Sequence, residues 1–207
     1  GTAFIAITVP LGSLFFFNAF VTEEQVEKKV VEYRTLKSID DLSMIENLIH
    51  ESKCFAFDTE TTSIDSLEAE LVGVSFSFEA NSGYYLPIAH QEKTAISRDE
   101  ALRWLKQIIE ASQDKVIGQN LKYDLQVLRN HQINIKKFYA DTMLMSYSIN
   151  STASRHNLDA LAEYYLNIKT IKFEDVMGKG KNKLKNFSEV PIKEATNYAA
   201  EDADITL

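Results

Sequence analysis

Apolar and small polar residues alternate most regularly between residues 70 and 80, where the chain reads ELVGVSFSFEA. Every second residue of an extended chain lies on the same side, so this pattern predicts a strand with one packed face. The packed side would carry Val72, Val74, Phe76 and Phe78, and the other side Gly73, Ser75 and Ser77. The turn residues NSG at 81–83 and the apolar run YYLPIA that follows complete a predicted hairpin.

Helical periodicity appears in other segments. Four apolar residues between positions 38 and 49 share one helical face, namely Leu42, Ile45, Leu48 and Ile49. Ser97 and Glu100 have the spacing of a capping box, and the apolar stripe after them predicts a helix to residue 111. Further helices are predicted at about 120–130, 141–149, 157–166 and 191–207.

Strands are predicted around these helices. Short buried strands are expected at 53–57 and 115–118, and the change from charged to apolar residues at Val30 indicates an earlier first strand. Antiparallel strands therefore come first, and strand–helix alternation follows. This order predicts an α/β fold with a mixed sheet flanked by helices. A length of 207 residues fits one domain.

The composition narrows the class of protein. The chain is 45% hydrophobic and 25% charged, which is typical of a globular protein rather than a disordered one. Its single cysteine, Cys54, excludes an internal disulfide and is consistent with a reducing compartment, so we expect a cytoplasmic protein. The net charge of −8 argues against a domain that grips long duplex nucleic acid by itself. Bound metal ions could still supply local positive charge.

Two segments depart from this average. Six lysines lie between residues 169 and 185, at positions 169, 172, 179, 181, 183 and 185. They could form a solvated loop or a patch that contacts phosphates. Residues 2–21 are mostly apolar and reach the length of a membrane span, but no basic residues precede them and Pro10 interrupts them. We expect an expression-derived or interdomain segment over residues 1–29, and no membrane partner.

Two carboxylates, Asp58 and Glu60, follow the buried strand directly in the segment CFAFDTETTS. On an extended chain their side chains point the same way and can converge on one point. Like charges about 4 Å apart repel by ~4 kcal/mol at an effective dielectric constant of ~20. The pair is either a solvated strand end or one half of a metal site.

Another acid, Asp124, falls inside the apolar stripe of Leu121, Leu125 and Leu128. A carboxylate on a buried helical face is costly unless it is paired or coordinated. It could therefore bond a nearby arginine or backbone amide, or it could hold a metal ion.

In the last predicted helix, Tyr198 and Asp202 are one turn apart and share a face with small residues. Glu201 and Asp204 point elsewhere and are expected to be ordinary surface acids. Four acids are then available, Asp58, Glu60, Asp124 and Asp202. Two divalent cations would offset their charge, and oxygen ligands favour Mg²⁺ or Mn²⁺. Two such ions about 3.5–4 Å apart can clamp the attacking and leaving oxygens of a phosphoryl displacement.

Three segments, FAFDTET, VIGQNLKYD and YAAEDAD, resemble the three signature motifs of the proofreading 3′–5′ exonuclease domain of bacterial DNA polymerase I. The resemblance includes RHNLDALAEYYL and IKFEDVMGKGKNKL and runs from about Tyr33 to the C-terminus. It implies a ribonuclease H-like fold with a five-stranded mixed sheet. It also implies hydrolysis with two divalent cations, Mg²⁺ or Mn²⁺, or Zn²⁺ at the first site, and release of 5′-mononucleotides.

The resemblance further assigns roles to single residues. Asp58, Glu60 and Asp202 would hold the first metal ion, Asp58 would bridge to the second, and Asp124 would hold the second through water. Tyr198 would orient the attacking water, with help from Glu60. The contacts to single-stranded DNA would come from Ile64, Asn120, Tyr123, Arg155 and Phe173.

Two alternatives stay open at this point. An RNA-trimming exonuclease of the ribonuclease D type uses the same acids and tyrosine. A catalytically silent scaffold domain usually lacks one of the acids, and none is missing here. The resemblance also implies that residues 30–207 form an exonuclease domain, cut off before a polymerase domain of the same parent chain. Its expected partner is a single-stranded DNA 3′ end, and we expect it to be a monomer.

Overall fold

The computed structural model describes residues 6–8, 14–16, 30–153 and 155–207. Near the N-terminus, β1 (Ala6–Thr8) and β2 (Leu14–Phe16) pair as an antiparallel ladder. Most of the apolar stretch 2–21 lies outside the described residues, so the interpretation of residues 1–29 stays a prediction. Within the described ranges, none of the helices has both the length and the apolar character needed to cross a bilayer.

Six strands form the main sheet, in the order β3-β6-β5-β4-β7-β8. Their bounds are Glu32–Thr35 for β3, Phe55–Thr61 for β4, Leu71–Ser77 for β5, Ser82–Pro87 for β6, Val116–Gly118 for β7 and Ala140–Asp141 for β8. Strand β5 is antiparallel to β4 and β6, whereas β3 is parallel to β6, and β7 is parallel to β4 and β8. The hairpin and the mixed sheet are confirmed. The expected count of five strands is wrong, because the two residues of β8 extend the sheet beside β7.

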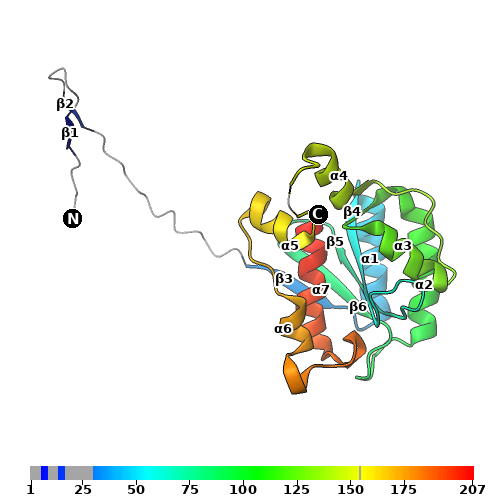
Figure 1. Ribbon diagram of the computed structural model, residues 1–207. Helices are drawn as coiled ribbons and strands as arrows, with labels where there is room; N and C mark the ends of the chain where they lie inside the picture. Colours follow the sequence, from blue (N-terminus) through cyan, green and yellow to red (C-terminus); the bar gives the residue numbers. More distant parts are fainter. Residues whose placement is uncertain (1–5, 9–13, 17–29, 154) are drawn as a thin grey trace.

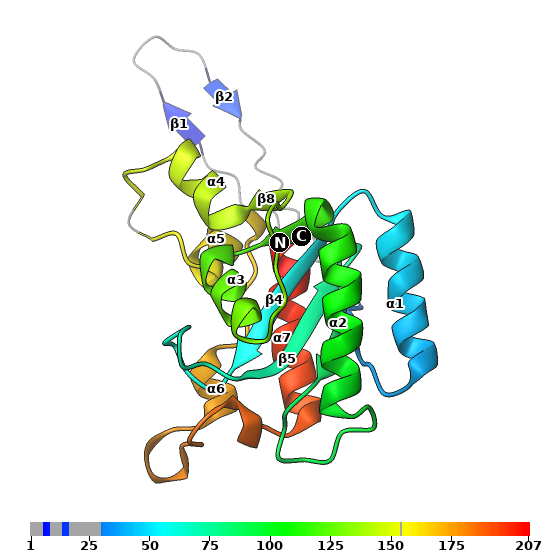
Figure 2. The same cartoon turned by 90° about the vertical axis from the view of Figure 1, so that its right-hand side faces the viewer.

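Helices cover both faces of this sheet (Figures 1 and 2). Helices α1 (Ile39–Glu51) and α2 (Arg98–Ser112) lie on one face, and α7 (Ile192–Thr206) crosses the other. The other helices are α3 (Leu121–Asn130), α4 (Thr142–Ile149), α5 (Leu158–Leu161), a π-helical turn (Ala162–Leu166) and α6 (Phe173–Met177). Short 3₁₀ turns occupy Gln113–Lys115, Gly180–Asn182 and Phe187–Glu189. Every predicted helix is present, but the sequence pattern misses α6 inside the lysine-rich segment.

Hydrogen bonds at the helix starts explain where the chain changes direction. Ser38 and Asp41 form a reciprocal capping box on α1, with N–O distances of 3.0 and 3.1 Å. At α2, the Ser97 hydroxyl accepts from the backbone amide of Glu100 at 3.3 Å, which is one half of the predicted capping box.

Both faces of β5 are buried, contrary to the expected single packed face. Val74 and Phe76 pack in the core beneath α1 and α2, whereas Val72, predicted on the same side, packs in the cluster beneath α7. The small residues of the other side lie against the layer that holds α7. A Cβ at Gly73 would lie 2.1 Å from the hydroxyl oxygen of Tyr85, and one at Gly83 would lie 2.6 Å from the carbonyl oxygen of Ala200. Small residues here allow α7 to approach the sheet and do not mark exposure to solvent.

Candidate active site

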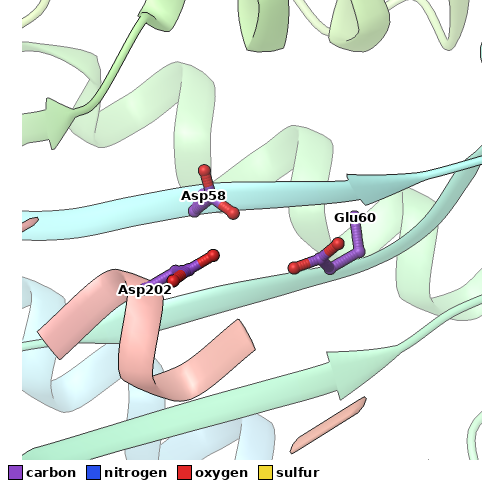
Figure 3. Close-up of side chains that lie close together, drawn as sticks. All are labelled: Asp58, Glu60 and Asp202. Atoms are coloured by element: carbon purple, nitrogen blue, oxygen red, sulfur yellow. The ribbon is translucent and has the colours of Figure 1, made fainter. Parts of the chain in front are cut away.

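Three carboxyl groups from two elements meet over one face of the sheet (Figure 3). Strand β4 supplies Asp58 and Glu60, whose side chains lie on the same side of the strand as the alternation predicts, and α7 supplies Asp202. One carboxylate oxygen from each of the three lies within 4.8 Å of the others. Residues separated by some 140 positions of sequence are thus brought to one point.

The local sequence explains why this space is available. The residues paired with Asp58 and Glu60 on β5 are Ser75 and Gly73, which are both small. On α7, Ala199 is fully buried one turn before Ala203, so the helix lies close to the sheet. The register of β4 and β5 shifts between Glu60 and the following residue, which ends the regular ladder at the acids.

The fourth acid, Asp124, lies in the first turn of α3 and is only 3% exposed. The hydroxyl of Thr59 donates to its Oδ1 at 2.5 Å. Asp141 fixes the start of α3, because its Oδ2 accepts from the backbone amide of Leu121 at 2.8 Å. Asp124 lines the same cavity as the other three acids but is not part of their close group.

All four acids have a raised pKa. Burial raises the pKa of Asp58 to about 7. Burial also raises the pKa of Glu60, and the charges of Asp58 and Asp202 add to the increase. At Asp124 and Asp202, burial is again the largest cause of the raised pKa, followed by the charge of Asp58. Without a compensating cation, the site therefore favours the protonated carboxyl groups.

Tyr198 lies one turn before Asp202 on α7, and its ring packs in an aromatic cluster. The ring centroids of Phe173 and Phe187 are 6.2 and 5.9 Å from that of Tyr198. Burial raises the pKa of the Tyr198 phenol, and the charges of Asp202 and Glu60 raise it further. The phenol therefore stays protonated and can donate a hydrogen bond beside the acids.

The acids line a cavity of about 550 Å³. Four of the five predicted DNA contacts line it as well, namely Ile64, Asn120, Tyr123 and Phe173. Ile64 is 97% exposed. Asn120 has a φ of 66° at the start of α3, and the Tyr123 hydroxyl hydrogen-bonds Thr61 at 2.5 Å and donates to the carbonyl oxygen of Ser63. Arg155 does not line this cavity and lies in a separate depression with Asp159 and Lys172.

The expectation that Glu201 and Asp204 are ordinary surface acids is wrong. Asp204 accepts from the Tyr33 hydroxyl at 2.9 Å and from the backbone amide of Asn81 at 2.8 Å. Glu201 accepts from the backbone amide of Ile171 at 2.6 Å. Both acids connect α7 to segments that are distant in sequence, and the helical pattern alone could not reveal those partners.

The sequence analysis missed Thr59, and it did not distinguish Lys183 and Lys185 from the other lysines of their segment. Thr59 lies between the two acids of β4, so the strand alternation could have placed it on the opposite side, toward α3. Lys183 and Lys185 line the cavity, but only the lysine-rich composition of their segment indicated a contact with phosphate.

The donor set fits divalent cations. Three buried or half-buried carboxylates offer oxygen atoms within 4.8 Å of one another, and a fourth lies in the same cavity. Hard cations prefer such oxygen ligands, and a cation would offset the repulsion and burial that raise the four pKa values. The ligand atoms do not distinguish Mg²⁺ from Mn²⁺.

Comparison with known proteins gives a consistent result. The sequence profile of a family described as 3′–5′ exonuclease matches residues 33–207. DNA polymerase I of Pseudomonas aeruginosa is 45% identical over 164 residues, which cover 77% of this chain and 18% of the polymerase. DNA polymerase I of Borreliella burgdorferi is 38% identical over 181 residues, which cover 87% of this chain and 19% of the polymerase. The chain thus spans less than a fifth of the length of either polymerase.

Solved structures support the architecture. The Nibbler EXO domain of Aedes aegypti is 14% identical and superposes with a TM-score of 0.60, covering 88% of this chain and 86% of that domain. NrnC of Brucella melitensis is 19% identical, with a TM-score of 0.55, covering 86% of this chain and 76% of that protein. These similarities concern the fold alone, and they confirm the predicted ribonuclease H-like architecture.

Proposed function

Because the chain belongs to the 3′–5′ exonuclease family, we propose that its acidic cavity hydrolyses the terminal phosphodiester bond at the 3′ end of single-stranded or frayed DNA. The product of each cycle would be a 5′-mononucleotide. The observation that carries the proposal is the group of Asp58, Glu60 and Asp202, with oxygens within 4.8 Å of one another, in a cavity that also holds Asp124 and Tyr198.

The acids would hold two divalent cations, Mg²⁺ or Mn²⁺, with Zn²⁺ an alternative at the first position. Asp58, Glu60 and Asp202 would hold the first ion, and Asp58 and Asp124 the second, the latter through water. Bound cations would neutralise the phosphodiester and stabilise the charge that develops on its oxygens during displacement. The raised pKa values of the acids support this, because a buried carboxylate gains most from a neighbouring cation.

The remaining side chains would bind and orient the substrate and water. The protonated phenol of Tyr198 would orient the attacking water, and Glu60 would accept a hydrogen bond from the same water. Phe173 and Tyr123 would stack on unpaired bases, a contact worth ~1–3 kcal/mol per base. Ile64, which is exposed at the cavity, would separate the terminal base from the next. Asn120 and, from outside the cavity, Arg155 would contact the backbone.

A mismatched end unpairs at lower cost than a paired end, so it would enter the cavity more often. This preference would make the domain a proofreading module. We propose that residues 30–207 form that domain, that the parent chain also carries a polymerase domain, and that the protein acts as a cytoplasmic monomer. The relatives from Pseudomonas aeruginosa and Borreliella burgdorferi support this proposal, since both are DNA polymerase I.

The direct test is a mismatch-excision assay in Mg²⁺ with the 207-residue chain. We expect faster removal of a mismatched than of a paired 3′ nucleotide, and faster cleavage of DNA than of an RNA oligonucleotide of the same sequence. Asp124→Ala should abolish cleavage, whereas Asp175→Ala, a change of an exposed acid outside the cavity, should not. Equal cleavage by Asp124→Ala and the unaltered chain would contradict the assignment.

A further inference from the structure

The lysine-rich segment divides into two groups in the structure. Lys172 pairs with Asp159 at 2.9 Å, and Lys179 lies 3.7 and 3.8 Å from Glu174 and Asp175. These two lysines therefore have partners within the chain. Lys183 and Lys185 differ, because both line the cavity that holds the four acids.

The backbone explains why two lysines separated by one residue face the cavity together. Leu184, which lies between them, packs against the apolar cluster beneath α7, and its amide donates to the carbonyl oxygen of Met177 at 2.8 Å. Lys183 has an extended backbone, with φ −67° and ψ 127°. Neighbours of an inward-pointing residue on an extended chain point outward, so both ammonium groups are directed away from the core.

Neither ammonium group takes part in an ion pair in the part of the chain that the structure describes. Lys183 and Lys185 thus line the cavity without an ion pair to its acids among the described residues. They add two cations to the lining of a cavity that also holds the four acids.

We propose that Lys183 and Lys185 bind backbone phosphates of the single strand upstream of the scissile bond. The inference rests on the proposed exonuclease function, since a nucleic-acid strand must enter this cavity. An ammonium group on a flexible stem suits a phosphate whose exact position varies along the strand. The acids would act on the terminal phosphodiester bond, while the two lysines would hold the strand that leads to it and keep its 3′ end in the cavity.

The test compares two double variants that remove the same charge from one segment. Lys183→Gln/Lys185→Gln removes the two cavity lysines, and Lys179→Gln/Lys181→Gln is the matched control outside the cavity. Cleavage of a twelve-nucleotide single strand is measured in Mg²⁺ between 50 and 200 mM salt. On single strands, each phosphate contact contributes about 0.7 to the slope with which the logarithm of the affinity falls against the logarithm of the salt concentration. The loss of two contacts should therefore lower this salt slope by about 1.4.

Over this fourfold rise in salt, KM of the unaltered chain should therefore increase about sevenfold more than KM of the cavity variant, with kcat nearly unchanged. A dinucleotide, which has no upstream phosphate, should be cleaved equally by all three proteins. Equal salt slopes in the unaltered chain and the cavity variant, or an equal loss in the control variant, would overturn the proposal.

Fluorescence anisotropy of the same oligonucleotide in EDTA separates this inference from the function on which it rests. A chain that does not cleave in Mg²⁺ refutes the exonuclease, while a weaker affinity of the cavity variant alone in EDTA still supports the phosphate contacts. If the unaltered chain cleaves, two results together refute the proposed phosphate contacts of Lys183 and Lys185. These are equal affinities of the two double variants in EDTA and equal salt slopes of the unaltered chain and the cavity variant in Mg²⁺.

Discussion

The hydroxyl of Thr59 donates a hydrogen bond of 2.5 Å to Oδ1 of Asp124. The bond joins β4 to α3 beside Asp58 and Glu60, the two acids of β4 that lie close to Asp202 of α7. Hydrogen bonding lowers the pKa of Asp124, against the larger effect of burial, which raises it. A neutral side chain therefore helps to keep the most buried Asp of the site ionised, as a metal ligand must be.

The first prediction concerns this bond. In Thr59→Val the shape is kept but the donor is lost, so the pKa of Asp124 should rise further and metal binding should weaken. We expect the Mg²⁺ concentration for half-maximal activity to increase by roughly 10–100-fold, the usual range for the loss of a residue that orients a metal ligand. The acid limb of the pH–rate profile should move to higher pH. Thr59→Ser keeps the hydroxyl and should restore the original Mg²⁺ dependence, and an unchanged dependence in Thr59→Val would contradict the role of the bond.

The second prediction separates two acids that lie two residues apart on α7. Asp204→Ala leaves the Tyr33 hydroxyl and the Asn81 amide without their acceptor. These donors are half-buried, and a typical hydrogen bond contributes about 1 kcal/mol, so urea unfolding should show a loss of about this size while activity in Mg²⁺ is retained. Asp202→Ala removes a desolvated carboxylate from the site, so we expect a higher unfolding free energy in EDTA and no detectable activity.

Metal binding distinguishes the same pair by a second measurement. At one hundred times its Kd, Mn²⁺ should raise the unfolding free energy of the unaltered chain and of Asp204→Ala by about 2.7 kcal/mol. It should not stabilise Asp202→Ala. Loss of activity in Asp204→Ala with an unchanged fold would show instead that the structural acid has a role in the chemistry.

The third prediction concerns pH. The pKa of Asp58 is raised to about 7, and those of Glu60, Asp124 and Asp202 are raised as well. The folded chain therefore holds protons at these acids that the unfolded chain has already released. Their contribution to stability is complete below about pH 4 and is lost as the pH rises through the folded-state pKa. In EDTA, the unfolding free energy should fall from pH 4 to 8 more steeply in the unaltered chain than in Asp58→Asn.

In Mn²⁺ the unfolding free energy should instead rise with pH, because the cation requires deprotonated carboxylates and its binding releases protons. Calorimetric titrations at pH 6 and pH 8 should therefore show tighter Mn²⁺ binding at the higher pH. Identical pH slopes for the unaltered chain and Asp58→Asn in EDTA would show that the site is not the source of the effect.

Much of the site could be predicted because its residues obey short periods. Asp58 and Glu60 are two apart on a strand, and Tyr198 and Asp202 are four apart on a helix, so each pair must share a side. The polar residue inside an apolar stripe identified Asp124. The hairpin and most helices followed from the same two periods.

Other features depend on contacts between distant segments, which no local pattern contains. The bond between Tyr33 and Asp204 spans 171 residues, so Asp204 could not be distinguished from a surface acid. The serines of β5 read as an exposed face, but the close approach of α7 buries them. The lysine-rich segment could not be divided into cavity and surface lysines, because that division depends on how Leu184 packs.

The last prediction concerns Tyr198. Its ring packs against the rings of Phe173 and Phe187 in the cavity that holds the acids, and the charges of Asp202 and Glu60 raise the pKa of its hydroxyl. Tyr198→Phe should therefore keep the fold and the metal site while the water loses its donor. A misplaced reactant can cost a factor of about 100, so we expect kcat to fall roughly 10–100-fold with little change in KM or in the Mg²⁺ requirement.

The matched control is Tyr84→Phe, a tyrosine that packs on the opposite face of the sheet, with the core beneath α1 and α2. It should keep full activity, since its hydroxyl is remote from the acids. The kinetic pattern of Tyr198→Phe decides between two roles for the phenol. A fall in kcat at saturating Mg²⁺ supports the orientation of water, because the ligands are then fully occupied. A higher Mg²⁺ requirement with an unchanged maximal rate would instead mean that the phenol acts by holding Asp202 in place as a ligand.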